Sequence, residues 1–514
     1  MKLKSLVYVT LALSFLLAFT GEASKIKVSR TGKLTHGYVF VDANGRARLF
    51  HGVNAVYKIP PWRPELTGFD FRYSLSEEDA KLLSSWGFNV VRLGVMWPGV
   101  EPQYQVFDRQ YLSDIMTIVN NLGKYGIYTI IDLHQDLGNR AFCGEGIPDW
   151  AAYKPELGER SFPWPVRNET MPLDDDGYPM LSECLKVTFS TYYTTKAVQA
   201  EFQGLYDNKN NALDEFCNFW YEVARTFVGN EYVLGYELIN EPFTGDTYAD
   251  PELLVPGVAD NRNLYPMYQK AHNAIRKVDD ETIIFFERTT LNVVGTGGLP
   301  EGPGGAEYND RQAYSYHNYC GTVDRTGNPM DVKLCEMQQL VQWNTDMADI
   351  DKLKCGSFIT EFGAISGNNT KSIKTLQWLL KKADEQIQSW AYWQYKSYND
   401  ITTASNEKES FFWADGTLQS DKVGTLIRPY AQAISGLPTY HMFNTTGKVF
   451  TLKYVANGDM AEFPTEIFVG ALPTHTVKVT PAEAATYTEK SGILYVYHSK
   501  TLSNQTVTVE VAGN

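Results

Sequence analysis

Residues 233–242 read Val-Leu-Gly-Tyr-Glu-Leu-Ile-Asn-Glu-Pro. The stretch begins as a mostly apolar run, which is typical of a strand buried on both faces. It ends at Asn240-Glu241-Pro242, where a carboxylate stands at a polar break in the pattern. The run Ile359-Thr360-Glu361-Phe362-Gly363 places a second glutamate in the same way. We therefore expect two buried strands that each deliver one carboxylate to the edge of a sheet.

Further runs of the same kind occur on both sides of this stretch and alternate with helical patterns such as 76–86 and 213–228. Such alternation predicts βαβ units and a parallel sheet. Eight strands followed by crossover helices predict an α/β fold of the closed (β/α)8 TIM-barrel type. An open doubly wound sheet is the structural alternative, but no glycine-rich phosphate loop follows the first run. The predicted strands are 48–55, 89–95, 128–134, 233–241, 282–288, 313–319, 357–362 and 390–396.

The pattern changes from about residue 436 onward, where helical periodicity stops. Short alternating runs appear at 450–455, 466–469, 476–479, 493–497 and 507–511, which predicts a small antiparallel β-sandwich. We therefore expect a signal peptide over 1–23, a catalytic barrel over 24–435 and a C-terminal sandwich over 436–514.

The first residues resemble a secretory signal. Lys2 and Lys4 precede an apolar stretch at 6–19, and small residues make cleavage near Ala23 plausible. The stretch is too short for a typical spanning helix, so we expect a secreted protein without a stable membrane span, located extracellularly or in a digestive or lysosomal lumen. Glycosylation sequons begin at Asn168, Asn368, Asn444 and Asn504.

Charge and cysteine content narrow the class of protein. The net charge of −14 argues against nucleic acid as a partner. Six cysteines, an even number, suit an oxidising compartment, and their spacing argues against a metal site. The sequence does not decide the pairing, although Cys320 and Cys335 flank one loop and form the pair that we favour. We expect a monomer.

The two strand-end glutamates suggest a chemistry. Catalytic groups of a TIM barrel lie at the carboxyl ends of its strands, so Glu241 and Glu361 are expected at one rim. Glycoside hydrolysis needs two carboxylates, one protonated to release the leaving alcohol and one ionised to attack the anomeric carbon. A separation of about 5–5.5 Å gives retention of configuration. No metal or organic cofactor is required by this chemistry.

The barrel resembles glycoside hydrolase family five, a group of retaining β-glycosidases. The resemblance is carried by Asn-Glu-Pro, by the glutamate of the seventh strand and by polar or aromatic residues at four other strand ends. It implies that Glu241 is the acid/base and Glu361 the nucleophile. The substrate-binding residues that it implies are Arg92, His134, Asn240, His317, Tyr319 and Trp393.

Each of these residues has a physical role to offer. Arg92 would keep Glu361 ionised, since an opposite charge lowers a carboxylate pKa, and Tyr319 would donate to the same group. Asn240 would bind the sugar 2-hydroxyl, and Trp393 would lie beneath the ring. The alternatives are structural: an ion pair for the arginine, buried polar groups for His134 and His317, and packing for the tryptophan. Glu237 is expected to be structural, while Glu287 lies near the end of the fifth strand, where it can line the cleft.

Within family five the chain looks most like endoglycoceramidases, which release an intact oligosaccharide from the ceramide of a glycosphingolipid. The resemblance lies in residues 54–58 and 132–136 and in the appended sandwich. It implies that Lys58, Asp136 and Trp164 contact the sugar headgroup, and that the substrate is presented in micelles or membranes. Aromatic residues of the third loop and of 411–413 are candidates for a ceramide path, although packing is the simpler role for most of them.

Two other functions remain open. The first is a family-five enzyme acting on another β-linked substrate, such as cellulose, mannan or simple glucosylceramide. The second is a non-catalytic carbohydrate-binding barrel, which the intact pair of carboxylates argues against.

Overall fold

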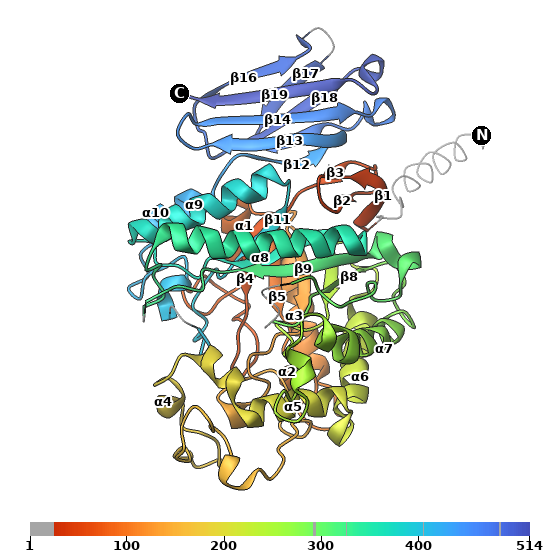
Figure 1. The fold of residues 1–514 in the computed structure, drawn as a ribbon. Helices are drawn as coiled ribbons and strands as arrows, with labels where there is room; N and C mark the ends of the chain where they lie inside the picture. Colours follow the sequence, from red (N-terminus) through yellow and green to blue (C-terminus); the bar gives the residue numbers. More distant parts are fainter. Residues whose placement is uncertain (1–24, 291–294, 325, 404–405, 483–484) are drawn as a thin grey trace, which may run out of the picture.

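The computed structural model describes residues 25–290, 295–324, 326–403, 406–482 and 485–514. The predicted signal peptide at 1–23 lies outside these ranges. Figure 1 shows the barrel with a β-sandwich stacked on one side of it. Among the residues that the structure describes, no helix combines the length and the apolarity needed to cross a bilayer.

The predicted TIM barrel is confirmed. Eight parallel strands close in the order β10-β11-β4-β5-β6-β7-β8-β9. Their residues are almost all buried on both faces, which explains why the sequence shows continuous apolar runs there instead of alternation. The strands are β4 (His51–Ala55), β5 (Val90–Gly94), β6 (Tyr128–Asp132), β7 (Val233–Glu237), β8 (Ile283–Phe286), β9 (Gln312–Asn318), β10 (Gly356–Phe362) and β11 (Ser389–Tyr392).

Helices follow the strands and cover the outside of the barrel. The first begins at Ser76, whose side chain accepts a hydrogen bond from Asp79 N while the Asp79 carboxylate accepts one from Ser76 N. This capping box satisfies backbone donors that the helix leaves open. The helices are α1 (Glu77–Ser85), α2 (Trp97–Val100), α3 (Arg109–Gly123), α4 (Leu181–Cys184), α5 (Lys196–Tyr206), α6 (Ala212–Phe227), α7 (Tyr265–Ile275), α8 (Val332–Leu353), α9 (Thr370–Glu385) and α10 (Ser420–Leu426).

An aromatic cluster lies at the amino-terminal end of the barrel strands. Phe50, Phe285 and Phe358 pack around Phe40 at ring separations of 5.8–6.4 Å. Phe40 comes from β2 (Tyr38–Val41), which pairs with β1 (Lys27–Lys33). These strands cover the amino-terminal end, and the polar residues described below lie at the carboxyl end of the barrel, as is usual for this fold.

The predicted C-terminal antiparallel region is confirmed, but it recruits strands from outside 436–514. One sheet has the order β13-β14-β19-β16 and the other the order β1-β2-β3-β12-β15-β18-β17. Thus β12 (Tyr430–Ile434) and the short β3 (Ala47–Arg48) belong to the sandwich sheet rather than to the barrel. The remaining strands are β13 (Gly436–Asn444), β14 (Val449–Ala456), β15 (Thr465–Phe468), β16 (His475–Thr480), β17 (Ala485–Lys490), β18 (Ile493–His498) and β19 (Thr506–Gly513).

Two disulfides hold loops on the active side of the barrel. The pairing of Cys320 with Cys335 is confirmed, and it ties the loop after β9 to α8. A second bond, between Cys143 and Cys184, closes the long segment between β6 and α5. Cys217 and Cys355 are free, and Cys355 is fully buried.

Candidate active site

Glu241 lies just beyond the end of β7, in a backbone conformation that side chains rarely adopt. Its φ is +41°, in the left-handed region that costs a non-glycine residue free energy. Glu287 Oε1 accepts a hydrogen bond from Glu241 N at 2.7 Å, and Gln135 Nε2 donates to the carbonyls of Asn240 and Glu241 at 2.6 and 3.1 Å. These contacts fix the turn, so the carboxylate is presented at the rim.

Glu361 lies within β10, and each of its carboxylate oxygens has its own donor. Arg92 on β5 donates from Nη1 to Oε1 at 2.6 Å. Tyr319, just after β9, donates from Oη to Oε2 at 2.9 Å. Hydrogen bonds and a positive charge favour the ionised form of a carboxyl group. Glu361 is thus oriented and provided with the partners that an anion needs.

One imidazole joins the two carboxylates. His317 Nδ1 lies 2.8 Å from Glu241 Oε1 and 3.4 Å from Glu361 Oε2. An oxygen of each glutamate lies within 4.8 Å of the other. Retaining glycosidases hold their carboxyl groups about 5–5.5 Å apart, whereas inverting enzymes need roughly 6.5–9.5 Å to admit a water molecule. The spacing therefore fits a double displacement.

The two glutamates have different electrostatic surroundings. Burial and, as the next largest cause, the negative charge of Asp136 raise the pKa of Glu241 to about 7. Burial also raises the pKa of Glu361, although the charges of His317 and Arg92 act in the opposite direction. The expected lowering effect of the arginine is thus present, but the loss of solvation outweighs it, so the net shift of the Glu361 pKa is upward. The direct ion pair and the phenol still single out Glu361 as the group that is held as an anion.

Arg92 is completely buried and contacts several polar side chains of the site. Besides Glu361 it contacts Glu237 and, at 3.1 Å, Asp132. Its Nη2 donates to Asn240 Oδ1 at 2.8 Å. Arg92 is therefore both a structural ion-pair partner and a direct neighbour of Glu361. Glu237 has the expected structural role, because its carboxylate holds the Arg92 side chain. Glu287 does not line the cavity that contains Glu241; its role is to hold the turn.

A buried ion cluster forms one end of the site. Lys58 Nζ lies 2.7 Å from Asp136, 2.9 Å from Asp400 and 3.6 Å from Glu145. Burial lowers the pKa of Lys58, but the three carboxylates outweigh burial and hold this pKa well above its ordinary value. Thr402 Oγ1 completes the cluster, with hydrogen bonds to the carboxylates of Asp136 and Glu145 at 2.9 and 2.8 Å.

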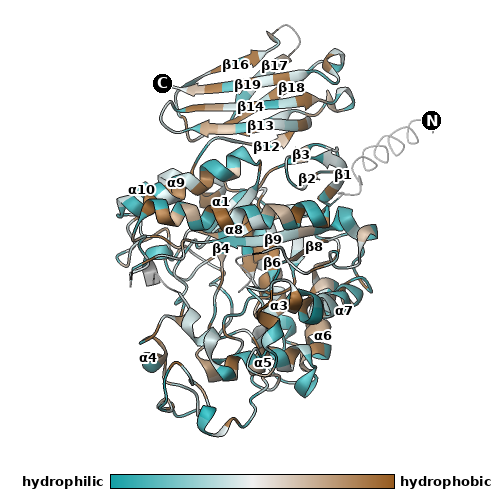
Figure 2. Ribbon diagram, viewed as in Figure 1, coloured by the Kyte–Doolittle hydropathy of each residue, from teal (hydrophilic) through white to brown (hydrophobic). Residues whose placement is uncertain are grey.

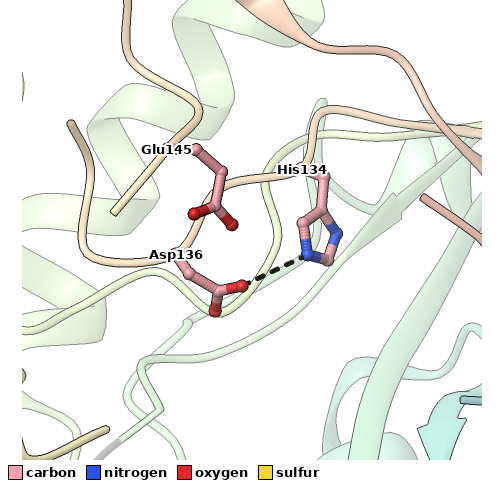
Figure 3. Close-up of side chains that lie close together, drawn as sticks. All are labelled: His134, Asp136 and Glu145. Carbon is pink, nitrogen blue, oxygen red and sulfur yellow. Dashed lines mark ion pairs between the residues drawn. The ribbon is translucent and has the colours of Figure 1, made fainter. Parts of the chain in front are cut away.

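Figure 3 shows three side chains of this region, His134, Asp136 and Glu145, which converge as metal ligands do. The Lys58 ammonium already supplies a cation to the two carboxylates. His134 lies 2.8 Å from Asp132 and 3.5 Å from Asp136. Burial lowers the pKa of His134, but the charge and hydrogen bond of Asp132 outweigh it and raise this pKa to about 9. The group is therefore an internal salt-bridge network that includes a protonated imidazole.

The site residues surround a cavity of about 300 Å³. Trp393, directly after β11, forms part of its wall; its ring stacks on His134 at 5.1 Å and lies 4.8 Å from Lys58 Nζ. The cavity also contains side chains of Asn240 and both catalytic glutamates. A polar, aromatic pocket of this kind suits a sugar ring, which presents hydroxyls at its edge and C–H groups on its face.

The remaining wall of the cavity has a different character. Phe189, Val323, Pro329 and Ile365 line it, in loops that follow strands β6, β9 and β10. The cavity is therefore polar on the side of Lys58 and partly apolar on the other. The aromatic residues at 411–413 do not form this wall; Phe411 and Phe412 are buried in the core, which is the packing role expected for most of the candidates.

Trp164 does not line this cavity. Its ring packs 5.6 Å from that of Tyr248, and the guanidinium of Arg160 lies 5.2 Å from it. A contact between Trp164 and the headgroup stays a prediction. Sequence reasoning missed Glu145, Asp400 and Thr402, which lie in loops without a recognisable pattern and meet Lys58 only in the folded chain.

A closed TIM barrel with this pair of glutamates defines a retaining β-glycosidase, and the comparisons agree. The family model described as Cellulase (glycosyl hydrolase family 5) matches residues 42–399, and the glycoside hydrolase family 5 C-terminal domain matches 428–511. An endoglycoceramidase of Cyanea nozakii is 37% identical, with 90% of each chain covered. One of Hydra vulgaris is 35% identical, covering 92% of this chain and 88% of the relative.

The fold is shared with a solved structure as well. Endo-glycoceramidase II from Rhodococcus sp., in its complex with ganglioside GM3, has a TM-score of 0.74 at 23% identity, covering 92% of this chain and 99% of that chain. The chain belongs to glycosyl hydrolase family 5 and, within it, to the endoglycoceramidases.

Proposed function

We propose that the protein is a retaining endo-glycosidase that cleaves the β-glycosidic bond between the oligosaccharide and the ceramide of a glycosphingolipid. The observation that carries the proposal is the pair of glutamates with oxygens within 4.8 Å of each other, one partly buried with a pKa of about 7 and one ion-paired to Arg92. This difference assigns an acid and a nucleophile to the two positions.

In the first step Glu361 attacks the anomeric carbon as the bond to the ceramide oxygen breaks. Glu241 transfers its proton to that oxygen, so ceramide leaves as a neutral alcohol. Arg92 and Tyr319 hold the attacking carboxylate in position, because each of them donates a hydrogen bond to one of its two oxygens. The product of this step is a glycosyl ester on Glu361 and an ionised Glu241.

In the second step the ionised Glu241 accepts a proton from a water molecule, and the resulting hydroxide attacks the anomeric carbon. The ester bond to Glu361 breaks, and the oligosaccharide is released with its original anomeric configuration. Glu241 is then protonated again, which restores the starting state. His317, in contact with both glutamates, keeps their oxygens at the spacing that both steps need.

The two sides of the cavity support the choice of substrate. The sugar headgroup fits the side of Lys58, Asp136 and Trp393, where charged and aromatic groups converge. Ceramide fits the side of Phe189 and Val323, because apolar chains gain free energy when they leave water. The relatives from Cyanea nozakii and Hydra vulgaris are endoglycoceramidases, which is consistent with this assignment. We propose that the glycolipid is presented in micelles or membranes.

We further propose that the protein is exported, glycosylated and monomeric. The signal-like segment at 1–23 and the two disulfides support export into an oxidising compartment. All four sequon asparagines are exposed, as glycan attachment requires: Asn168, Asn368, Asn444 and Asn504.

One assay tests the proposed reaction. The purified protein is incubated separately with a ganglioside, with lactosylceramide and with carboxymethyl cellulose, and the products are analysed by mass spectrometry. We expect intact oligosaccharide and ceramide from the glycolipids and no release from cellulose. Glucose oligomers from cellulose would favour a β-glucanase, and the absence of any product would favour a non-catalytic barrel.

A further inference from the structure

A second cavity lies beside the active-site cavity, among loops at the same end of the barrel. Its volume is about 450 Å³, and it meets the active-site cavity at Lys58, whose side chain lines both. Neither cavity is closed off from solvent, so a ligand can extend from one into the other past Lys58. We call it the outer cavity and define it by six of its lining residues: Lys58, Trp62, Arg140, Glu145, Asp149 and Tyr178.

The outer cavity is built mainly by the long segment that joins β6 to α5. This segment supplies Arg140, Glu145 and Tyr178, while Trp62 comes from the loop after β4. Figure 1 places α4, which belongs to the segment, at the end of the molecule away from the sandwich. Figure 2 shows hydrophilic and hydrophobic residues mixed along the chain around α4. The walls are therefore strand-end loops of mixed character, the part of a TIM barrel that binds ligands.

Glu145 is held in a rigid turn between the two cavities. Its backbone pairs with that of Asp136, with hydrogen bonds of 2.8 and 3.0 Å in the two directions. A Cβ added to Gly144 or to Gly146 would lie only 2.1 or 2.3 Å from the nearest atom, so the chain packs here as only glycine allows. Asp136 lines the active-site cavity and Glu145 lines the outer one, so this paired turn connects the two cavities.

One oxygen atom of Glu145 is buried without a partner. The residue is 3% exposed, and Oε1 accepts a hydrogen bond from Thr402 Oγ1 at 2.8 Å. Oε2 has no hydrogen-bond partner among the residues that the structure describes. Burial raises the pKa of Glu145 well above its ordinary value, so the group is a neutral carboxyl that both donates and accepts. A buried polar atom of this kind is stabilised by a ligand hydroxyl, which has the same double capacity.

Tyr178 offers an apolar contact surface in the same cavity. The guanidinium of Arg140 lies over its ring, 3.5 Å from the ring centre. Asp149 Oδ2 accepts hydrogen bonds from Arg140 Nη2 at 2.7 Å and from Nε at 3.0 Å, which fixes the guanidinium. The cation–π contact therefore holds the ring in one orientation. A fixed aromatic ring together with a neutral carboxyl suits a sugar, which has C–H groups on its faces and hydroxyls at its edge.

The charges of the lining favour a neutral ligand. Lys58 and Arg140 are the lysine and arginine side chains that line the outer cavity in the described part of the chain, and both are already paired with carboxylates. Asp149 is the partner of Arg140, and Asp174 adds another carboxylate to the lining. An acidic sugar would therefore meet carboxylates and no unpaired cation.

We propose that the outer cavity binds neutral sugar residues of the headgroup that lie beyond the sugars held in the active-site cavity. This inference rests on the proposed function, because only an oligosaccharide fixed at the two glutamates extends past Lys58 in this way. Lys58 lies on the side of the active-site cavity to which we assign the headgroup, so a longer headgroup enters the outer cavity there. Contacts remote from the reacting bond act equally on bound substrate and transition state, so they lower KM and leave kcat unchanged.

The test compares two glycolipids that differ only in the length of the headgroup. One is lactosylceramide, and the other is a neutral four-sugar glycosylceramide whose first two sugars are lactose, presented in the same micelles. We expect the wild-type kcat/KM to be about fivefold higher for the longer headgroup, through KM, a factor that one aromatic contact and one hydrogen bond supply. Tyr178→Ala should bring the ratio of the two kcat/KM values to about one.

Two further substitutions examine Glu145 through the same ratio. Glu145→Leu removes the hydrogen-bonding atoms and should also bring the ratio to about one, whereas Glu145→Gln keeps a neutral donor and acceptor and should retain the wild-type ratio. Tyr308→Ala is the matched control. Its ring lies 4.3 Å from the Arg311 guanidinium, but it precedes β9, at the opposite end of the barrel, so the ratio should stay at the wild-type value.

Calorimetric titration measures binding without turnover. In the Glu361→Gln background, the free neutral tetrasaccharide should bind about fivefold more tightly than lactose, by the same two contacts, and adding Tyr178→Ala should remove the difference. Three results would overturn the outer site: equal wild-type kcat/KM for both headgroups, a ratio unchanged in both Tyr178→Ala and Glu145→Leu, and a larger gain for a four-sugar headgroup that ends in a sialic acid. Failure of the proposed function is a separate outcome, since the wild type would then cleave neither glycolipid, while titration would still report whether the tetrasaccharide binds through Tyr178.

Discussion

Glu241 and Glu361 have the same side chain and lie within 4.8 Å of each other, yet their contacts differ. Glu361 has an arginine and a phenol as direct donors, whereas Glu241 has one imidazole and is affected by burial and by the negative charge of Asp136. Residue type alone does not separate an acid from a nucleophile. The separation comes from the solvation and charge around each carboxyl group.

Substitution of the two glutamates should give different results on different leaving groups. Glu361→Gln removes the nucleophile and should abolish turnover of both lactosylceramide and lactosyl fluoride. Glu241→Gln should slow hydrolysis of lactosylceramide by about 10²–10⁴-fold, the usual contribution of general acid catalysis. It should form the glycosyl-enzyme from lactosyl fluoride at nearly the wild-type rate, because fluoride leaves without a proton. Pre-steady-state measurement of fluoride release checks this, and equal losses in that burst for both variants would contradict the assignment.

The pH dependence of kcat/KM should report the pKa of the general acid, Glu241. Glu241 must be protonated to act, and its pKa is about 7, so kcat/KM for lactosylceramide should fall as the pH rises above about 7. The negative charge of Asp136 contributes to this raised pKa. Asp136→Asn should therefore move the alkaline limb to lower pH, in addition to any loss of affinity. The pH profile of kcat/KM in both proteins is the measurement, and an alkaline limb that moves upward in the variant would argue against this coupling.

At the scale of elements, the loop between β6 and α5 builds one wall of the cavity. It contributes Phe189 and is closed by the bond between Cys143 and Cys184, which spans a sequence separation of 41. The chain-entropy model assigns about 4 kcal/mol to closing a loop of this length. The disulfide therefore orders a segment that has little regular structure of its own.

Replacing both cysteines of that bond should loosen the wall without removing any catalytic group. The double variant Cys143→Ser, Cys184→Ser should raise the KM for lactosylceramide and increase proteolytic cleavage within 144–183. Cys217→Ser, which removes a free thiol from α6, serves as the control and should behave like the wild type. Limited proteolysis and steady-state kinetics provide the readouts. Identical cleavage patterns in both variants would show that the loop does not depend on the bond.

Sequence patterns predicted the elements that bury a continuous face. The eight barrel strands were found because each is an apolar run, and Cys320 was paired correctly because it flanks a short loop with Cys335. The sandwich strands β12 and β13 were missed. β12 directly follows the last helix of the barrel, so its residues were assigned to the barrel. β1 and β2 were also missed: they pair locally with each other, and β2 pairs with β3, which alone reaches the distant β12.

At the scale of the whole molecule, a buried cluster joins the barrel to the sandwich. Asp384 at the end of α9 contacts Arg428, accepts a hydrogen bond from Phe443 N at 3.1 Å and lies 3.6 Å from His441 Nδ1. Both Asp384 and Arg428 are nearly inaccessible to solvent, with 2% and 3% of their surface exposed. Removing one partner from such a pair leaves an uncompensated charge in the interior.

Asp384→Asn should therefore destabilise the protein by about 3–5 kcal/mol, the range measured when a buried ion pair loses one partner. The neighbouring Glu385 offers a matched control, because its ion pairs with Lys381 and Lys382 are partly exposed. Glu385→Gln should change stability by less than about 1 kcal/mol. Chemical unfolding followed by fluorescence measures both variants. A loss for Asp384→Asn no larger than that of the control would show that the cluster does not hold the two units together.

The sequence by itself determined the barrel, the antiparallel sandwich, the reaction class and the two glutamates. These features depend on local patterns, namely apolar runs, the polar break after each run and the residues that accompany it. Only the tertiary structure decided what surrounds each group: burial that outweighs the charge of Arg92 at Glu361, three carboxylates around Lys58, a Trp164 that packs outside the cavity, and sandwich strands drawn from both ends of the chain. The physical reason is that solvation, charge and strand pairing depend on groups distant in sequence, which become neighbours only when the barrel closes.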